Sequence, residues 1–340
     1  DDSGSRHYLG HENRSQNAAI LEDTVLYIRR SGGSISKIAA MKNAVGNFID
    51  QVTANATGDP ATNEDDVTHR IGIVKFSGNE SDQIGNDTYR SDGNTYNYSQ
   101  AVQDLTSVTG NVQSLKNAVN ELAAAGSTRT DFGLNQAQRV LDGDWQHGLG
   151  GAREEAKQVV VVFTDGEPST FSNWSGGVAA NAVNLAKDLK DDKVTVYTIG
   201  MFEDADPSDT DGRFNKYMNG VSSNYPNAEV TNWRGDRTQD WDDCKLGTRV
   251  TEGNYYFAAD DAEELENAFS TIADNVSTSK VAAGANTVLS DTLSEFFTFP
   301  EGLTGSSDGG WSSMRRSRAR TRTAAIRGMS QRRLQALPLW

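Results

Sequence analysis

The sequence predicts an α/β fold: a doubly wound, mostly parallel central sheet flanked by helices. Residues 159–163 are consecutive apolar residues, four of them β-branched, which suits a strand covered on both faces. Along the chain, further stretches of strand type alternate with segments whose apolar residues recur at helical spacing. That alternation is typical of parallel strands joined by crossover helices.

The individual elements follow from these two periodicities. Ser36 is placed to cap a helix in which Ile38, Met41, Val45 and Phe48 share one face. Strands are expected at residues 71–76, within 98–108, and at 159–163, 194–200 and 255–258. The other helices are expected over residues 112–122 and 134–141, in a segment ending near Lys190, and over 214–221 and 265–276. Long polar segments at 6–34, 77–97 and 224–253 are expected to be loops.

Composition bounds the class of protein. The 340 residues carry a formal net charge of −15, but eight arginines and no acid fall in residues 315–340. Residues 1–314 therefore hold 24 basic and 47 acidic groups, a net charge of −23. An acidic body argues against nucleic-acid binding and favours attraction of cations. Only Cys244 is present, which excludes an internal disulfide, and no apolar run is long enough to insert into a membrane.

The character of the sequence changes near its end. Residues 1–278 contain all of the alternating strand and helix patterns. Residues 279–313 are interpreted as the beginning of a second, β-rich domain, since residues 286–299 are β-prone and no helix follows. Residues 314–340 form a basic, arginine-rich tail, for which two interpretations stay open: a disordered segment that binds an acidic surface, and out-of-frame translation.

Three short motifs carry the chemistry. The chain starts with the pattern D-x-S-x-S, formed by Asp1, Ser3 and Ser5. The small polar loop at residues 126–130 leads into a helix, and Thr164-Asp165-Gly166 follows directly after the apolar strand. In open α/β sheets, ligands bind beyond the carboxyl ends of the strands, where Asp165 is expected to lie.

Together the three motifs resemble the metal-ion-dependent adhesion site of the von Willebrand factor A family, which has a Rossmann-like fold. The resemblance covers about residues 1–278 and implies that the metal ligands are Asp1, Ser3, Ser5, Thr128 and Asp165. Thr128 is preferred to Thr130 because its spacing to Leu134 matches the family pattern, and Thr130 is the fallback. In the family a central strand precedes D-x-S-x-S, so we expect this chain to be an N-terminally truncated fragment that lacks its first central strand.

The residue types suit a hard divalent cation. Mg²⁺ takes six oxygen ligands, and Mn²⁺ and Ca²⁺ also prefer oxygen. Two carboxylates and three hydroxyls supply oxygen but leave the cation incompletely neutralised, so it still attracts a carboxylate from a partner. The resemblance therefore implies a non-enzymatic, cation-dependent adhesion module of a Gram-positive cell-surface or pilus-tip protein. Its extracellular partner would be a host matrix or cell-surface protein that offers an acidic residue.

Two other functions stay open. An intracellular domain of this family that scaffolds a metal-chelatase-like complex would have the same site. A Mg²⁺-dependent hydrolase or phosphotransferase would need a general base near the metal, for which Asp2 and Glu167 are the only evident candidates.

One further motif matches a known recognition sequence. The tripeptide Arg234-Gly235-Asp236 matches an integrin-recognition sequence and lies in a segment expected to be an exposed loop. Because arginine and acidic residues are common here, the sequence alone favours a chance match.

Overall fold

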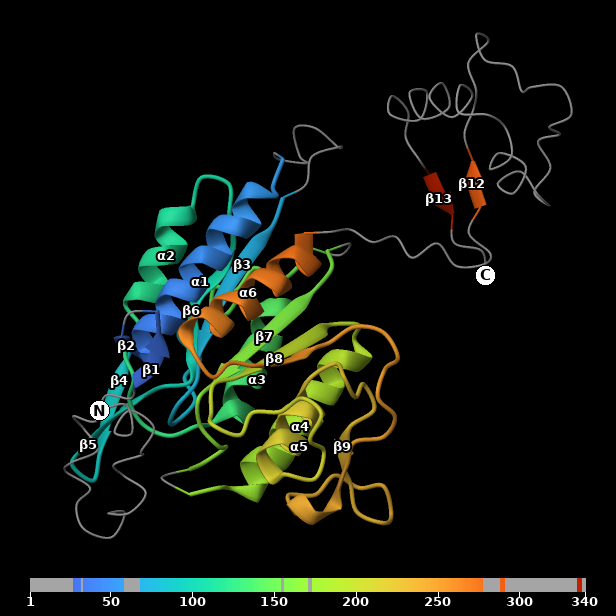
Figure 1. The fold of residues 1–340 in the computed structure, drawn as a ribbon. Coiled ribbons are helices and arrows are strands. Elements are labelled where there is room, and N and C mark those ends of the chain that lie inside the picture. Colours follow the sequence, from blue (N-terminus) through green and yellow to red (C-terminus); the bar gives the residue numbers. More distant parts are fainter. Residues whose placement is uncertain are drawn as a thin grey trace, which may run out of the picture. The chain divides into compact units, whose positions relative to one another are not determined.

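The computed structural model describes residues 27–31, 33–57, 68–153, 156–170, 173–277, 288–290 and 335–337. The chain divides into two units, residues 1–278 and 279–340, and the first carries the α/β fold (Figure 1). Of the expected metal ligands, Thr128 and Asp165 lie within the described residues, whereas Asp1, Ser3 and Ser5 lie outside them.

The elements of the first unit follow one another in the order expected for an α/β fold. The helices and the 3-10 turn are α1 (Lys37–Ala54), α2 (Val112–Asn120), α3 (Thr130–Asp142), α4 (Gly176–Asp191), α5 (Arg213–Val221), η3 (Trp241–Asp243) and α6 (Ala262–Ser277). The strands are β1 (Tyr27–Arg30), β2 (Gly33–Ser36), β3 (Arg70–Lys75), β4 (Thr88–Ser91), β5 (Asn94–Asn97), β6 (Gln100–Ser107), β7 (Val159–Thr164), β8 (Thr195–Gly200), β9 (Glu229–Val230), β10 (Cys244–Lys245) and β11 (Tyr256–Ala258).

The main strands form a parallel sheet and an antiparallel pair. Strand β8 lies between β7 and β11, and all three run parallel, with Val159 opposite Thr195 and Tyr256 opposite Thr198. Strand β3 pairs with β6 in the antiparallel sense. Within the described part of the chain no strand joins β3 to β7, so the two sheets are hydrogen-bonded separately.

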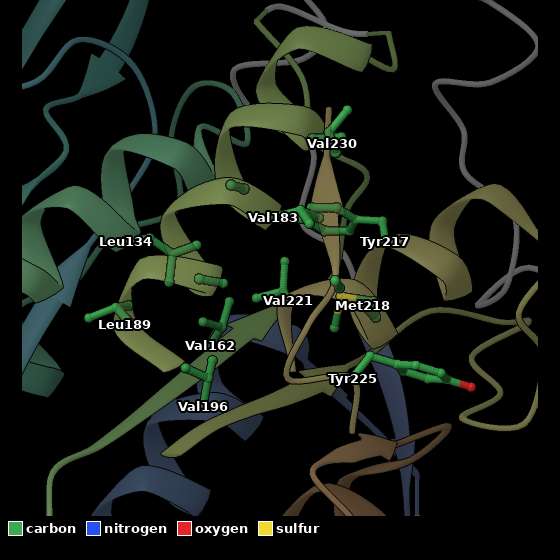
Figure 2. Close-up of a cluster of buried hydrophobic side chains, with 14 of the residues drawn as sticks. Leu134, Val162, Val183, Leu189, Val196, Tyr217, Met218, Val221, Tyr225 and Val230 are labelled. Atoms are coloured by element: carbon green, nitrogen blue, oxygen red, sulfur yellow. The ribbon is translucent and has the colours of Figure 1, made fainter. Parts of the chain in front are cut away.

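Helices cover both faces of the parallel sheet because β7 and β8 are apolar on both sides. Val160 and Val162 of β7 pack in a core with α3, α4 and α5, several of whose side chains are shown in Figure 2. Val159, Val161 and Phe163 pack on the opposite face, against the cluster formed by α1 and α6. The doubly wound α/β fold predicted from the sequence is confirmed.

Helix α1 begins where the sequence predicts. The hydroxyl of Ser36 accepts a hydrogen bond from the backbone N–H of Ala39 at 3.3 Å and so satisfies one of the free donors of the first turn. The apolar face of α1 is shared between the cluster with α6, through Ala40 and Ala44, and the cluster with α2 and β3, through Ile49 and Val52. Helix α1 therefore contacts the cores of both sheets.

A buried lysine closes the C-terminal end of α5. The Nζ of Lys190, on α4, donates to the carbonyl oxygens of Gly220, Ser222 and Tyr225 at 2.8, 3.2 and 3.0 Å. Gly220 belongs to the last turn of α5 and Ser222 is its C-cap, where a helix leaves carbonyl groups without an internal partner, and Tyr225 lies in the turn that follows. Burial lowers the pKa of Lys190 to about 7.

All three of the long segments predicted to be loops contain short strands. The segment 6–34 contains β1 and the start of β2, which pair in the antiparallel sense. The segment 77–97, predicted to be turns and loop, contains the hairpin of β4 and β5. Its turn is made by Asp92 and Gly93 at φ +52° and +84°, the left-handed conformations that a two-residue hairpin turn of type I′ requires. The stacked rings of Tyr89 and Tyr96, 5.5 Å apart, join the two strands. The segment 224–253 contains the antiparallel pair β9–β10.

The second unit is described only at two short strands. Strand β12 (Val288–Ser290) pairs antiparallel with β13 (Gln335–Leu337), which lies in the segment interpreted as a basic tail. Across the described residues of the whole chain, no helix combines the length and the apolar character needed to cross a membrane.

Candidate cation site at the carboxyl end of the parallel sheet

Asp165 lies immediately beyond the carboxyl end of β7. A tight local turn positions it: the hydroxyl of Thr164 donates to the carbonyl of Gly166 at 2.9 Å and accepts from the Gly166 N–H at 3.3 Å. Thr164 is buried, whereas the side chain of Asp165 is 39% exposed. The turn thus lifts one carboxylate out of the sheet toward solvent.

Within the described part of the chain, this carboxylate forms an ion pair with Lys37, the first residue of α1. Its Nζ lies 3.8 Å from Oδ2 of Asp165 and donates to the carbonyl oxygen of Met201, just beyond β8, at 3.0 Å. An ammonium group therefore lies where β7 and β8 end and α1 begins. The Asp165 carboxylate thus already attracts one positively charged group, the ammonium of Lys37.

The threonine loop lies against the loop that carries Asp165. The N–H of Thr128 donates to Oγ of Ser169 at 3.2 Å, and the N–H of Ser169 donates to the carbonyl oxygen of Thr128 at 3.0 Å. A Cβ placed on Gly166 would lie 3.3 Å from Oγ1 of Thr128, so the missing side chain at Gly166 leaves room for this hydroxyl. The structure thus brings Thr128 next to the turn that carries Asp165.

The same loop is attached to the end of β3. The hydroxyl of Ser77 donates to the carbonyl oxygen of Ala125, and Gly126 adopts φ +87° with its Cα close to Ser77. A Cβ at Gly126 would collide with Oγ of Ser77 at 2.3 Å, which explains why glycine stands at this position.

Thr130, the fallback ligand, faces the interior. It is the first residue of α3 and only 1% exposed, and its hydroxyl makes no hydrogen bond of good geometry to any of the described residues. It lies beside the hydroxyl of Tyr217, whose pKa burial raises. Further into α3, Gly133 allows the helix to approach the side chain of Phe76, since a Cβ on Gly133 would lie 2.8 Å from it.

The donor set fits a cation held largely by hydroxyl oxygen. Among the described residues, no three histidine, cysteine or acidic side chains gather into a metal-binding cluster. Within those residues the candidate ligands are the carboxylate of Asp165 and the hydroxyl of Thr128, both hard oxygen donors. The remaining ligands of the motif, Asp1, Ser3 and Ser5, lie outside the described residues.

Glu167, the candidate general base of an enzyme, is engaged elsewhere. Both of its carboxylate oxygens accept hydrogen bonds from Arg213, at 2.9 and 3.1 Å. The Arg213 guanidinium also lies over the ring of Trp174, at 4.5 Å from its centroid. Asp2, the other candidate, lies outside the described residues.

Sequence reasoning missed two residues of this site, Lys37 and Ser169. The position of Lys37 directly after the capping serine was a usable signal, because the first residue of the first crossover helix lies at the carboxyl end of the sheet. No local pattern marks Ser169, whose role depends on a contact with a loop 41 residues earlier in the chain.

The sequence and fold were compared with known proteins. The model of the von Willebrand factor type A domain matches residues 28–234, more than half of the chain. The chain belongs to the von Willebrand factor type A domain family. The matched region includes Thr128 and Asp165 but begins after the D-x-S-x-S motif. No curated protein sequence matches the chain significantly.

Solved structures similar to this von Willebrand factor type A (VWA) domain share little sequence with it. The pilus adhesin SpaC from Lactobacillus rhamnosus GG is 17% identical with a TM-score of 0.43, over 71% of this chain and 28% of that one. The minor pilin PilB from Streptococcus sanguinis is 12% identical with a TM-score of 0.42, over 71% and 54%. Proximal thread matrix protein 1 from the mussel byssus was solved with a zinc-occupied metal-ion-dependent adhesion site (MIDAS) motif. It is 15% identical with a TM-score of 0.37, over 70% of this chain and 42% of that one. The VWA domain thus spans only part of each of these proteins.

Proposed function

We infer that this VWA domain is a non-enzymatic, divalent-cation-dependent adhesion module of an extracellular surface or pilus protein. Asp165 and Thr128, together with Asp1, Ser3 and Ser5, would hold the cation at the carboxyl end of the parallel sheet. An acidic side chain of a protein partner would complete its coordination. Mg²⁺ is the expected ion, because the ligands are all hard oxygens.

The observation that carries this proposal is the pairing of the two loops. Two backbone-directed hydrogen bonds hold Thr128 against Ser169, four residues beyond Asp165. The loop that carries the Thr128 hydroxyl is thereby held against the loop that carries the partly exposed Asp165 carboxylate, although the two lie far apart in the sequence. Membership of the VWA family supports the proposal independently of this geometry.

The chemistry of capture follows from charge. Three hydroxyl ligands add no negative charge, so the cation is less fully neutralised than in a cage made only of carboxylates and still attracts the carboxylate of a partner. The negative charge on residues 1–314 raises the local concentration of cations rather than of acidic partners. Binding of an acidic partner is therefore expected to depend on the cation being present.

Calorimetric titration of the full chain with MgCl₂ tests the proposal. Asp165→Ala should abolish the binding heat, whereas Asp211→Ala, which removes an exposed acid after β8, should leave it unchanged. Equal Mg²⁺ binding by the wild type and Asp165→Ala would refute the site. Turnover of a panel of phosphate esters would instead favour the hydrolase class.

A further inference from the structure

A short hairpin carries the Arg-Gly-Asp tripeptide. Thr231 and Arg237 form an antiparallel bridge at its base. Above them the N–H of Asn232 donates to the carbonyl oxygen of Asp236 at 2.9 Å, and the N–H of Gly235 donates to that of Asn232 at 3.0 Å. Residues 233–236 are thus the tip of a closed turn.

The backbone, rather than the tripeptide's own side chains, sets the shape of this tip. Oδ1 of Asn232 accepts from the N–H groups of Arg234 and Asp236 at 2.8 and 3.1 Å. Gly235 adopts φ +85°, a conformation that favours glycine, and no atom lies within 4 Å of where its Cβ would be. The guanidinium of Arg234 takes no part in closing this turn, and the Asp236 carboxylate takes part only through a long hydrogen bond from the Asn232 amide, at 3.4 Å.

Hydrogen bonds on both sides of the hairpin attach it to side chains of α4. The guanidinium of Arg237 donates two hydrogen bonds to the carboxylate of Asp188. One residue before the hairpin, Val230 is fully buried, and its backbone N–H and C=O bond the side-chain amide of Asn184 at 2.9 and 3.1 Å. A partner would therefore meet a preformed shape and lose little entropy in ordering it.

The charged side chains at the tip form no ion pair with the described residues. Trp233 is 84% exposed, and the Arg234 guanidinium lies over its ring at 4.6 Å from the centroid. Among the described residues, neither Arg234 nor Asp236 forms an ion pair, and the Asp236 carboxylate accepts a long hydrogen bond from the Asn232 amide at 3.4 Å. An exposed aromatic ring next to an unpaired guanidinium is the composition of a binding hot spot.

We propose that the hairpin Thr231–Arg237 is a second adhesive site, recognised by a receptor that pairs a protein-bound divalent cation with an acidic pocket. The cation would take the Asp236 carboxylate, a hard oxygen ligand. The acidic pocket would take the Arg234 guanidinium, whose fork of donors matches a carboxylate. This is the chemistry of a receptor of the integrin type. The site reverses the roles of the proposed cation site, because here the VWA domain supplies the acid.

The ectodomain of an Arg-Gly-Asp-binding integrin, with Mn²⁺, is the probe. The full chain is immobilised and the Kd measured by surface plasmon resonance for the wild type, Asp236→Glu and Arg234→Lys. Each substitution keeps the charge but changes its reach or its donor geometry, and each should raise the Kd at least about thirtyfold, as for one damaged partner of a desolvated charge pair. A soluble Arg-Gly-Asp peptide should compete with the wild type.

Matched controls separate this site from the cation site. Asp211→Glu and Arg90→Lys make the same substitutions at exposed positions outside the hairpin and should bind as the wild type does. Asp165→Ala should also bind the receptor normally, whereas Asp236→Glu should keep its Mg²⁺ titration. The proposal is overturned if the wild type does not bind, or if Asp236→Glu binds equally well. Loss of receptor binding in Asp165→Ala alone would also overturn it.

Discussion

Replacement of Lys37 by methionine should strengthen binding of Mg²⁺ at the proposed site. The Nζ of Lys37 lies 3.8 Å from Oδ2 of Asp165, with side-chain exposures of 17% and 39%. Two unit charges about 4 Å apart interact by about 1 kcal/mol in water and about 4 kcal/mol at the effective dielectric of a protein surface. Because Asp165 is more than one-third exposed, we take the lower part of this range, about 1–2 kcal/mol.

This interaction opposes the metal in two ways. A cation that binds Asp165 must disrupt the Lys37 contact, and it then faces the positive charge of the displaced ammonium. Lys37→Met removes both effects and should lower the Kd for Mg²⁺ by roughly fivefold to thirtyfold. The gain should shrink as salt is added, because the pair is partly exposed to solvent.

Isothermal titration of the full chain at low ionic strength measures this effect. Lys42→Met is the matched control: Lys42 lies on the same helix, and its Nζ also donates to a carbonyl oxygen, that of Asn120, at 2.8 Å. The control should leave the Kd unchanged. A Kd for Lys37→Met equal to or weaker than that of the control would show that Lys37 does not compete for the site.

Three further predictions concern the site and its support. Thr128→Val should weaken Mg²⁺ binding without lowering stability. Thr130→Val should leave Mg²⁺ binding intact and change the free energy of unfolding by no more than about 1 kcal/mol, since its buried hydroxyl makes no hydrogen bond of good geometry to the described residues, the adjacent Tyr217 hydroxyl included. Calorimetry and urea unfolding separate the two variants. Lys190→Met should lower the free energy of unfolding by about 2–3 kcal/mol, because it removes the three hydrogen bonds that Nζ donates to buried carbonyl oxygens. Burial lowers the pKa of Lys190 to about 7 in the folded chain. Between pH 7 and 10 the side chain is therefore protonated mainly in the unfolded chain. The free energy of unfolding of the wild type, relative to that of Lys190→Met, should then rise with pH in this range, as urea unfolding at several pH values would measure. Gly133→Ala should destabilise the domain by about 1–3 kcal/mol, because its Cβ would meet Phe76 at 2.8 Å; an unchanged urea midpoint would contradict this packing.

The sequence contained enough information to predict most of the fold. Buried strands such as β7 and amphipathic helices such as α1 are encoded by local periodicity, and the start of α1 is encoded by a single capping residue, Ser36. These features depend only on neighbouring residues, so they can be predicted without knowledge of the tertiary structure.

The missed hairpins show where local patterns fail. The β4–β5 hairpin lies in a run of Asn, Asp, Ser and Tyr that has no apolar alternation, and only the Asp92-Gly93 turn marks it. The hairpin at 231–237 depends on Asn232 bonding two backbone groups and on Arg237 reaching Asp188 on α4. Polar strands held by such bonds carry no hydrophobic period from which to predict them.

In the candidate site too, some residues could be predicted from local motifs and others could not. Asp165 and the loop of Thr128 were predicted from motifs, and the structure places them side by side. Whether they hold a metal with Asp1, Ser3 and Ser5 stays a prediction. The placement of Lys37 beside Asp165 needed the ends of α1, β7 and β8 to meet, which no local pattern specifies.

The position of the site between the two sheets has a mechanical consequence. Within the described residues, β3–β6 and β7–β8–β11 share no strand pairing, so packing and loops hold the two sheets together. Helix α1 contacts the cores of both, and the threonine loop is bonded to the end of β3 through Ser77 and to the loop after β7 through Ser169. A ligand held by Thr128 and Asp165 would therefore add a link between the two sheets near the carboxyl ends of β3 and β7. Because such a link exists only in the folded state, ligand binding should raise the free energy of unfolding of the whole unit by mass action, and not merely order one loop.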